Sequence, residues 1–455
     1  MKRSTENSKT IIQNIWINRR HEKRNAAWRF ASCFDRGKEE LTQKERLRIR
    51  GLAEQLREEA AFAKQRQRVV RYKRINALQI EKPPVALHPP QQALRDLFPD
   101  NELIISDPYF RSLEYDFLMQ LSRARTWKCD MPVTDTLYTG LFFQVTDWMP
   151  GHKSVRINQD LTSTAFEPCI RQKRDLEKLE QPRLIVNHQA TEERFERVSD
   201  ILGDILDLHK GTPFGMTCGW GESMIDELAE MRGLEQLYLD MIDCPEFVHQ
   251  AMERLTEGKL DLLRQYMDEG VLSLNNGNQL IGSCSYPFTD ELPGMDYTPG
   301  RITPKNLWGF AQAQELSGVS KEMLEEFVLP YQTRIIQQFG LCSYGCCEAM
   351  DVKIDSVAKY IPNLRILSIS PFTDIELAAE KCRGKFVMAC KLHPEQLVDF
   401  DPLRLERYIR RLLELTQGCC ITLNFAELFY YDGHPRTFID ALETVSRAVE
   451  KYWKH

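Results

Sequence analysis

The feature that most constrains the fold is a repeated alternation in the second half of the chain. Short apolar runs alternate with stretches of helical periodicity there. Strands and helices that alternate at this spacing are typical of a parallel sheet with helical crossovers. A (β/α)8 TIM barrel needs about 250 residues, so we predict this α/β fold for residues 96–455. The clearest strand runs are 271–276, 341–346, 364–370, 386–390 and 419–424, with helices such as 320–330, 375–381 and 403–415 between them. The run 307–312 is either another strand or part of an insertion.

The N-terminal region has a different pattern. Residues 38–76 contain no proline and are rich in Glu, Arg, Gln, Ala and Leu. Their apolar residues recur three or four positions apart, which predicts an amphipathic helix or helix pair. The basic end, residues 66–74, is either a helix face packed on the body or a partner subunit, or an arm that binds anions; we expect the first. Pro-Pro pairs at 83–84 and 89–90 predict a linker. Residues 1–95 are therefore predicted to be a helical extension.

Composition limits the cellular setting and the partners. The 13 cysteines are an odd number without small-scaffold spacing, which favours free thiols in a reducing cytoplasm. A net charge of −6 gives no reason to expect nucleic acid or an anionic membrane as a partner. No run approaches the roughly 18 apolar residues of a membrane span, and the first residues lack the apolar core of a secretory signal. We expect a cytoplasmic protein.

The thiol-rich end of one strand run is the leading candidate site. Chemistry in a (β/α)8 barrel lies at the carboxyl ends of its strands. Cys346, Cys347 and Glu348 lie at the end of the run 341–346, so we expect them at the carboxyl end of the strand. Cys419 and Cys420 open the last run, so we expect them to pack in the core at the opposite end.

Two further residues follow strand runs at the same end. Glu427 comes after the last run, and His393 comes after the run 386–390. Sulfur, nitrogen and oxygen ligands with an open position would suit a catalytic zinc. Buried thiols without a metal are the alternative for the cysteines.

Polar residues near other strand ends are candidates for binding. Glu222 lies in a turn between a strand run and a helix, and Asn275 and Asn276 end another run. Tight turn formation is the alternative role for the two asparagines. Gln312 ends the run 307–312. The long segment 277–305 is expected to cover a site, as long βα loops of barrels do.

Residues 213–450 resemble the uroporphyrinogen decarboxylase superfamily, in the branch that includes corrinoid-dependent methyltransferases. The resemblance covers just over half of the chain, and its segments are short but follow the superfamily's order. The family fold is a (β/α)8 barrel, in agreement with the alternation above. The matching segments are 214–228, 239–248, 320–331, 367–370 and 391–394.

The resemblance implies a site as well as a fold. In the methyltransferase branch, a His-x-Cys motif and a second cysteine at the end of the last strand hold a zinc that activates a thiol. The first motif falls on Tyr344-Gly345-Cys346, with tyrosine in place of histidine, and the second position falls on Glu427. The decarboxylases' arginines have no clear counterpart, and Asp135 matches their aspartate by position only. Cys347 and Glu348 have no simple counterpart in the family and would replace the lost ligands. The strand-end positions and the resemblance together give three sets of candidates: metal ligands for zinc, or another divalent metal, at Cys346, Cys347 and Glu427; catalytic residues Tyr344, Glu348, His393 and Glu222; and cofactor-binding residues Asn275, Asn276 and Gln312.

These observations predict a methyltransferase. It would move a methyl group between a corrinoid, carried by a partner corrinoid protein, and a small-molecule acceptor. Two alternatives remain open: a decarboxylase or lyase of the same superfamily without a metal, and a non-catalytic barrel that binds a small ligand. The N-terminal helices would suit a homodimer.

Overall fold

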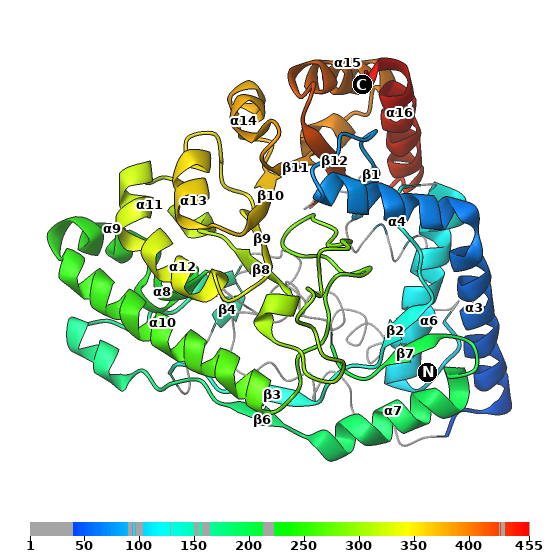
Figure 1. The fold of residues 1–455 in the computed structure, drawn as a ribbon, viewed down its shortest axis with the longest axis horizontal. Coiled ribbons are helices and arrows are strands. Elements are labelled where there is room, and N and C mark those ends of the chain that lie inside the picture. The colour runs from blue at the N-terminus through cyan, green and yellow to red at the C-terminus, as the bar shows by residue number, and fades with distance from the viewer. Residues whose placement is uncertain are drawn as a thin grey trace.

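The computed structural model describes residues 40–89, 93, 96, 103–127, 129–149, 154–156, 164–212, 223–426, 428 and 433–454. A six-stranded sheet lies at its centre, in the order β1-β12-β11-β10-β9-β8, and every neighbouring pair is parallel. Helices surround this sheet (Figure 1). Its strands are β1 Val85–Leu87, β8 Trp308–Ala311, β9 Leu341–Tyr344, β10 Leu364–Ile369, β11 Val387–Lys391 and β12 Cys420–Phe425.

The predicted alternation is confirmed in the C-terminal half. Helix α13 (Ile354–Tyr360) joins β9 to β10, α14 (Ile375–Cys382) joins β10 to β11, and α15 (Pro402–Leu415) joins β11 to β12. Before β9, Ser320 caps helix α11 (Lys321–Phe327) by accepting a hydrogen bond from the backbone of Met323. Strand pairing among the described residues does not close the sheet into a ring. The structure therefore shows a parallel α/β fold, and the closed (β/α)8 barrel stays a prediction.

Side chains along these strands alternate between two buried faces, as the two-residue period of a strand requires. Cys342, Leu367 and Met388 pack with the surrounding helices in the largest apolar cluster. Leu341 and Ile366, each one position earlier, belong to a separate cluster on the opposite side. We call the helix-covered side the outer face and the other side the inner face.

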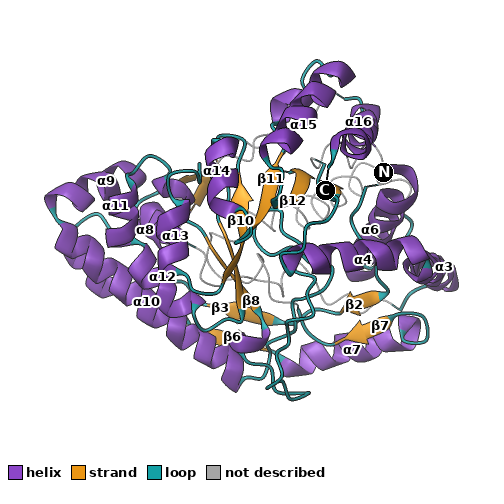
Figure 2. Ribbon diagram, turned by 45° about the horizontal axis from the view of Figure 1, so that its top comes forward, coloured by secondary structure: helices purple, strands orange, loops and turns teal. Residues whose placement is uncertain are grey.

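A loop covers the inner face. Residues 277–292, here the plug segment, place Ile281, Cys284 and Leu292 in the inner-face cluster. The Cys284 thiol lies 3.6 Å from the carbonyl oxygen of Ala389 in β11. Figure 1 shows this loop in the middle of the molecule, and Figure 2 shows strands of the sheet with helices around them. Segment 277–305 was expected to cover a site. The structure shows that its first part packs against the inner face of the sheet.

Strand β1 lies where the sequence predicts a linker. Residues 85–87 are buried and pair with residues 423–425 of the last strand. The linker prediction was wrong, because a strand of only three residues between two Pro-Pro pairs leaves no readable alternation. The pairing joins the first strand of the sheet to the last, whereas the domain boundary at residue 95 stays a prediction.

The N-terminal helix pair is confirmed as α3 (Gln43–Ala61) and α4 (Ala63–Asn76), separated by an extended Phe62. The apolar stripe of α3 packs in a cluster with residues of α6 (Pro108–Ser122) and α7 (His188–Leu202). Along α4, Arg68 and Arg71 lie 3.7 and 3.3 Å from the carboxylate of Asp130. The basic end is therefore held against acidic groups of the body, as expected, and is not an open anion-binding arm.

The run 271–276 was predicted as a strand, and the structure assigns none there. The side chain of Asn275 connects this segment to β8 in place of backbone hydrogen bonds between two strands. Its Oδ1 accepts from the N–H of Trp308 and its Nδ2 donates to the carbonyl of Trp308, both at 2.9 Å. This segment is thereby fastened to edge strand β8 through one side chain.

The remaining elements surround the sheet and the plug segment. No helix in the part of the chain that the structure describes is both long and apolar enough to cross a bilayer. The other strands form three pairs, β2–β7, β3–β6 and β4–β5. Their bounds are β2 Thr136–Tyr138, β3 Phe143–Val145, β4 Ser154–Arg156, β5 Thr164–Phe166, β6 Leu184–Val186 and β7 Asp207–His209. The other helices are α6 Pro108–Ser122, α7 His188–Leu202, α8 Met224–Arg232, α9 Leu234–Asp243, α10 Pro245–Asp268, α12 Leu329–Ile336 and α16 Arg436–Tyr452, with a π-helical turn η3 Arg123–Trp127 and 3-10 turns η4 Lys173–Lys178, η6 Pro304–Asn306, η7 Gln314–Leu316 and η8 Pro394–Leu397.

Candidate functional site

The candidate site begins where strand β9 ends, at Gly345. This residue has a φ of +96°, a conformation that glycine adopts without the steric cost of a Cβ. Its N–H donates to the carbonyl of Ala311 at 2.8 Å, which fixes the turn to the end of β8. The turn also contacts β10 and β11. The carbonyl of Cys346 accepts from Ser368 Oγ in β10 at 3.2 Å and from Lys391 Nζ in β11 at 2.7 Å.

Two thiols and an ammonium group meet at this turn. The sulfurs of Cys346 and Cys347 lie 3.7 Å apart. Lys391 Nζ lies 4.0 Å from the first sulfur and 3.7 Å from the second. Cys346 is 8% exposed, and Cys347 is half-buried. An ammonium beside a thiol favours the thiolate, which is the nucleophilic and basic form.

Lys391 reaches the thiols because of its place in β11. It shares the inner face with Val387 and Ala389, two and four residues earlier. Its side chain is 3% exposed, so its charge is held among protein groups. The plug segment adds to the same site, since Ser283 Oγ accepts from the Cys346 thiol at 3.5 Å. Ends of strands and plug segment together enclose the thiol pair.

The described residues do not fit a zinc site. Among them there is no group of three or more His, Cys, Asp or Glu side chains arranged to hold a metal ion. A dication bound by both sulfurs would lie close to the ammonium of Lys391, which would repel it. Glu427, the predicted third ligand, falls outside the described residues. Zinc binding by Cys346, Cys347 and Glu427 therefore stays a prediction.

Glu348 binds the backbone of the turn that carries the thiols. Its Oε2 accepts from the N–H of Cys346 at 2.9 Å, and its Oε1 accepts from the N–H of Ala313 at 3.2 Å. The side chain is 1% exposed. Nearby, burial lowers the pKa of Lys353, against the opposing effect of Glu348 and Asp226. Glu348 is thus placed to position the turn.

Tyr344 lies on the outer face, on the side of the sheet away from Lys391. It is fully buried, and its hydroxyl has no hydrogen-bond partner among the residues that the structure describes. Burial raises its pKa far above the usual range, and the carboxylates of Glu348 and Asp226 add to this. The structure therefore does not bring this predicted catalytic residue to the thiols.

The predicted cofactor-binding residues have protein partners. Asn275 is bound to Trp308 as described above. Asn276 Nδ2 donates to the carbonyl of Leu292 at 2.6 Å, which ties the two ends of the plug segment together. Gln312 Nε2 donates to Asp226 at 3.2 Å, near Tyr344. These contacts give each amide a structural role, and the structure does not place them around one cavity.

His393 lies beyond the end of β11 and caps the turn η8. Its Nδ1 accepts from the N–H of Glu395 at 3.2 Å, and its ring lies edge-on to exposed Phe372. The predicted catalytic residue Glu222 is outside the described residues. Cys419 and Cys420 are buried at the start of β12, as predicted.

Sequence reasoning missed two members of the site. Lys391 opens the matching segment 391–394, and its alternation with Val387 and Ala389 indicates that it faces inward. Ser283 carries no such signal, because its position follows from the path of the plug segment. The position of Lys391 was thus predictable from the sequence, and that of Ser283 was not.

Comparisons with known proteins do not assign the chain to a family. No protein-family model matches it, and no curated protein matches it. Among solved structures, a methyltransferase from Methanosarcina mazei is similar over 85% of this chain and 98% of that chain, with a TM-score of 0.47 and 10% sequence identity. A likeness at this level supports no conclusion about function, so the family resemblance stays a prediction.

Proposed function

We propose that this chain is a methyltransferase whose reacting site is the thiol pair with Lys391. The observation that carries the proposal is the contact of one ammonium with two thiols at the carboxyl ends of parallel strands. Strand ends are where parallel α/β folds place their chemistry. The family resemblance supplies the reaction type, and the site supplies the residues.

Cys347 is proposed as the proton acceptor. It is the more exposed of the two thiols and lies nearer to Lys391. Its thiolate takes the proton from the nucleophilic atom of the small-molecule acceptor. That atom then forms a bond to the methyl carbon while the bond between the carbon and its donor breaks, and the electron pair of the broken bond stays on the donor. The proton leaves Cys347 to water.

Lys391 and Glu348 have positioning and electrostatic roles in this proposal. The ammonium of Lys391 stabilises the thiolate and fixes the carbonyl of Cys346. The carboxylate of Glu348 holds the backbone of the same turn. Together they hold the turn that carries the two sulfurs at the strand end. No step is assigned to zinc.

A corrinoid is proposed as the methyl donor, presented by a partner protein. When bound, it would supply a methyl group that can be displaced by a nucleophile. Two cavities among the described residues, of about 170 and 340 Å³, are not lined by the thiols, and the donor would approach the thiols from outside the protein. A closed (β/α)8 barrel is part of the proposal and is supported by the pairing of β1 with β12.

The test is methyl transfer from methylcobalamin to a small thiol by the full-length chain. We expect loss of the methyl–cobalt absorption together with methylated thiol, detected by mass spectrometry, at a rate above that without protein. Chelator-treated protein should retain the rate. No change in absorption with any thiol or folate acceptor would contradict methyl transfer. Stoichiometric zinc whose removal abolishes the rate would contradict the metal-free site.

A further inference from the structure

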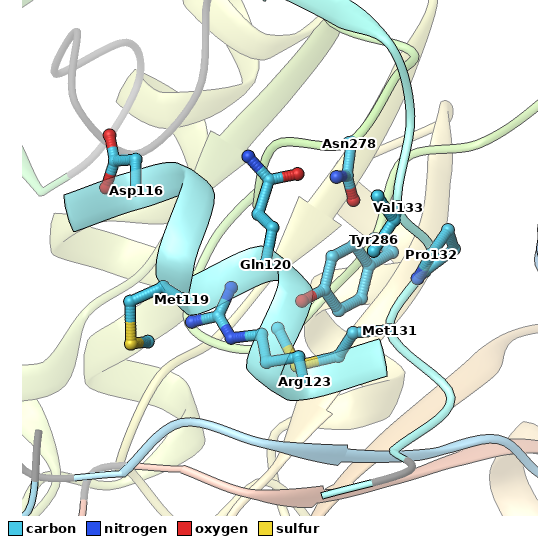
Figure 3. Close-up of a pocket in the computed structure, with 9 residues that line it drawn as sticks. All are labelled: Asp116, Met119, Gln120, Arg123, Met131, Pro132, Val133, Asn278 and Tyr286. Atoms are coloured by element: carbon cyan, nitrogen blue, oxygen red, sulfur yellow. The ribbon is translucent and has the colours of Figure 1, made fainter. Parts of the chain in front are cut away.

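A cavity of about 170 Å³ lies between the end of helix α6 and the plug segment. Figure 3 shows the side chains of Gln120 and Arg123, from α6 and the π-helical turn η3, near those of Asn278 and Tyr286 from the plug segment. Two methionines and a Pro-Val pair complete the wall. Segments far apart in the sequence therefore contribute polar groups to one partly open cavity.

Three polar side chains of this cavity have no hydrogen-bond partner in the described part of the chain. Arg123 Nε is buried without a hydrogen-bond partner, and within the described ranges its guanidinium forms no ion pair. The side-chain amides of Gln120 and Asn278 likewise make no hydrogen bond to any residue that the structure describes. A half-buried guanidinium without a counter-ion is costly, so a site of this kind is expected to bind something that pairs with it.

The backbone conformation at Arg123 also indicates a ligand-binding site. The helix changes there from α to π geometry. Single π-helical turns inside or after α-helices occur frequently at functional sites. Burial raises the pKa of the Tyr286 phenol, against the opposing effect of Arg123, so its hydroxyl stays protonated and can donate a hydrogen bond. A guanidinium, a phenol and two amides form a donor-rich lining.

We propose that this cavity binds a small organic acid, with its carboxylate paired to Arg123 and its body against the methionines. A guanidinium presents parallel N–H donors that match a carboxylate. A cavity of roughly 150 Å³ holds a molecule the size of benzene, so the ligand is an acid of that size. The carboxylate of Asp116 also lines the cavity, which disfavours ligands with a second negative charge.

The cavity and the thiol site share the plug segment. Ser283 contacts Cys346, and Tyr286, three residues later, lines the cavity. Occupation of the cavity would hold this part of the plug segment in place. The inference does not depend on methyl transfer, because it rests on the unpaired guanidinium and the cavity alone.

Calorimetric titration of the full-length chain tests the proposal. The probes are benzoate, the neutral isostere benzamide, and inorganic phosphate. We expect benzoate to bind at least tenfold more tightly than benzamide and phosphate. Arg123→Gln should weaken benzoate binding at least tenfold, as loss of a charge-assisted pair does, while Arg125→Gln, two residues away and bonded to Gln55 outside the cavity, should leave it unchanged.

Tyr286→Phe is the second variant, since it removes one hydroxyl and keeps the packing. It should weaken benzoate binding several-fold while the unfolding midpoint without ligand stays the same. Binding of benzamide as tight as benzoate, equal benzoate affinity of Arg123→Gln and the original chain, or no heat with benzoate at millimolar concentration would each overturn the proposal. Tighter binding of phosphate would overturn the assignment of a carboxylate ligand.

Discussion

Lys391 Nζ lies 3.7 Å from the sulfur of Cys347 and 2.7 Å from the carbonyl oxygen of Cys346, and so joins the ends of strands β11 and β9. Burial of an inward-facing lysine is costly unless its ammonium group is paired or hydrogen-bonded. Here the ammonium serves both to fix the turn and to favour a thiolate. The same residue therefore connects the local fold with the proposed chemistry.

Lys391→Met should slow alkylation of Cys347. Without the ammonium the thiolate is less favoured, and we expect iodoacetamide to react about tenfold more slowly at neutral pH, a difference of about 1.4 kcal/mol. Mass spectrometry of the Cys347 peptide measures the rate. Lys391→Arg should keep most of the reactivity, and exposed Lys385→Met should keep all of it. Equal rates for Lys391→Met and the original chain would show that the lysine does not act on the thiol.

Glu348→Ala should destabilise the fold. It leaves the N–H groups of Cys346 and Ala313 buried without their acceptor, at a cost of about 1–3 kcal/mol for each unsatisfied group. Urea unfolding should show a loss of about 2–4 kcal/mol. Glu348→Gln keeps one acceptor oxygen and should lose less, and exposed Glu380→Ala should lose almost nothing. A loss as small as that of Glu380→Ala would contradict the positioning role.

The variant Tyr344→Phe distinguishes a catalytic role for Tyr344 from a purely structural one. The sequence predicts a catalytic tyrosine, whereas the structure buries its hydroxyl on the outer face without a described partner. Removing an unsatisfied buried hydroxyl is neutral or stabilising, by up to about 1 kcal/mol. We expect the variant to retain methyl transfer and to unfold at the same or a higher urea concentration. A large fall in kcat would restore Tyr344 to the reacting site.

Glu45 gives the N-terminal helix pair a pH dependence. Burial alone would raise the pKa of Glu45, but hydrogen bonds from Ser106 and Thr42 outweigh it and lower the pKa to about 2 from an ordinary value of 4.5. The stability from this group is present above pH 4.5 and is lost as pH falls through about 2, because the unfolded chain binds the proton first.

Comparison of Glu45→Gln with the original chain measures this effect. The difference in unfolding free energy should be at most about 3 kcal/mol at neutral pH and should shrink steadily as pH falls below 4.5. Exposed Glu58→Gln is the control and should show no such trend. A difference that stays constant with pH would contradict the role assigned to the carboxylate.

Much of the C-terminal half was predictable because its strands are buried on both faces and are separated by capped helices. Strand β1 was not, since three residues between Pro-Pro pairs carry no period. The run 271–276 reads as a strand, but the side chain of Asn275 replaces the ladder with Trp308. Local sequence patterns predict helices and strands, but they do not predict a contact that a single side chain makes with a distant segment.

The candidate site was predictable in part. The cysteines at the end of β9 follow from strand polarity, and Cys419 with Cys420 were correctly placed in the core. The plug segment was missed as an inner-face element because long loops carry no signal for what they pack against. The cavity at Arg123 was missed for the same reason, since it joins a helix end to that loop.

The most direct test of the central claim is a single-turnover measurement of methyl transfer from methylcobalamin to a small thiol, with Cys347→Ala and Cys244→Ala compared across pH. Cys244 lies at the start of helix α10, outside the site. We predict that Cys244→Ala keeps both the rate and the pH profile. Cys347→Ala should lose at least tenfold in rate, together with the rise in rate with pH that a thiolate base produces. An unchanged rate and pH profile in Cys347→Ala would contradict the account.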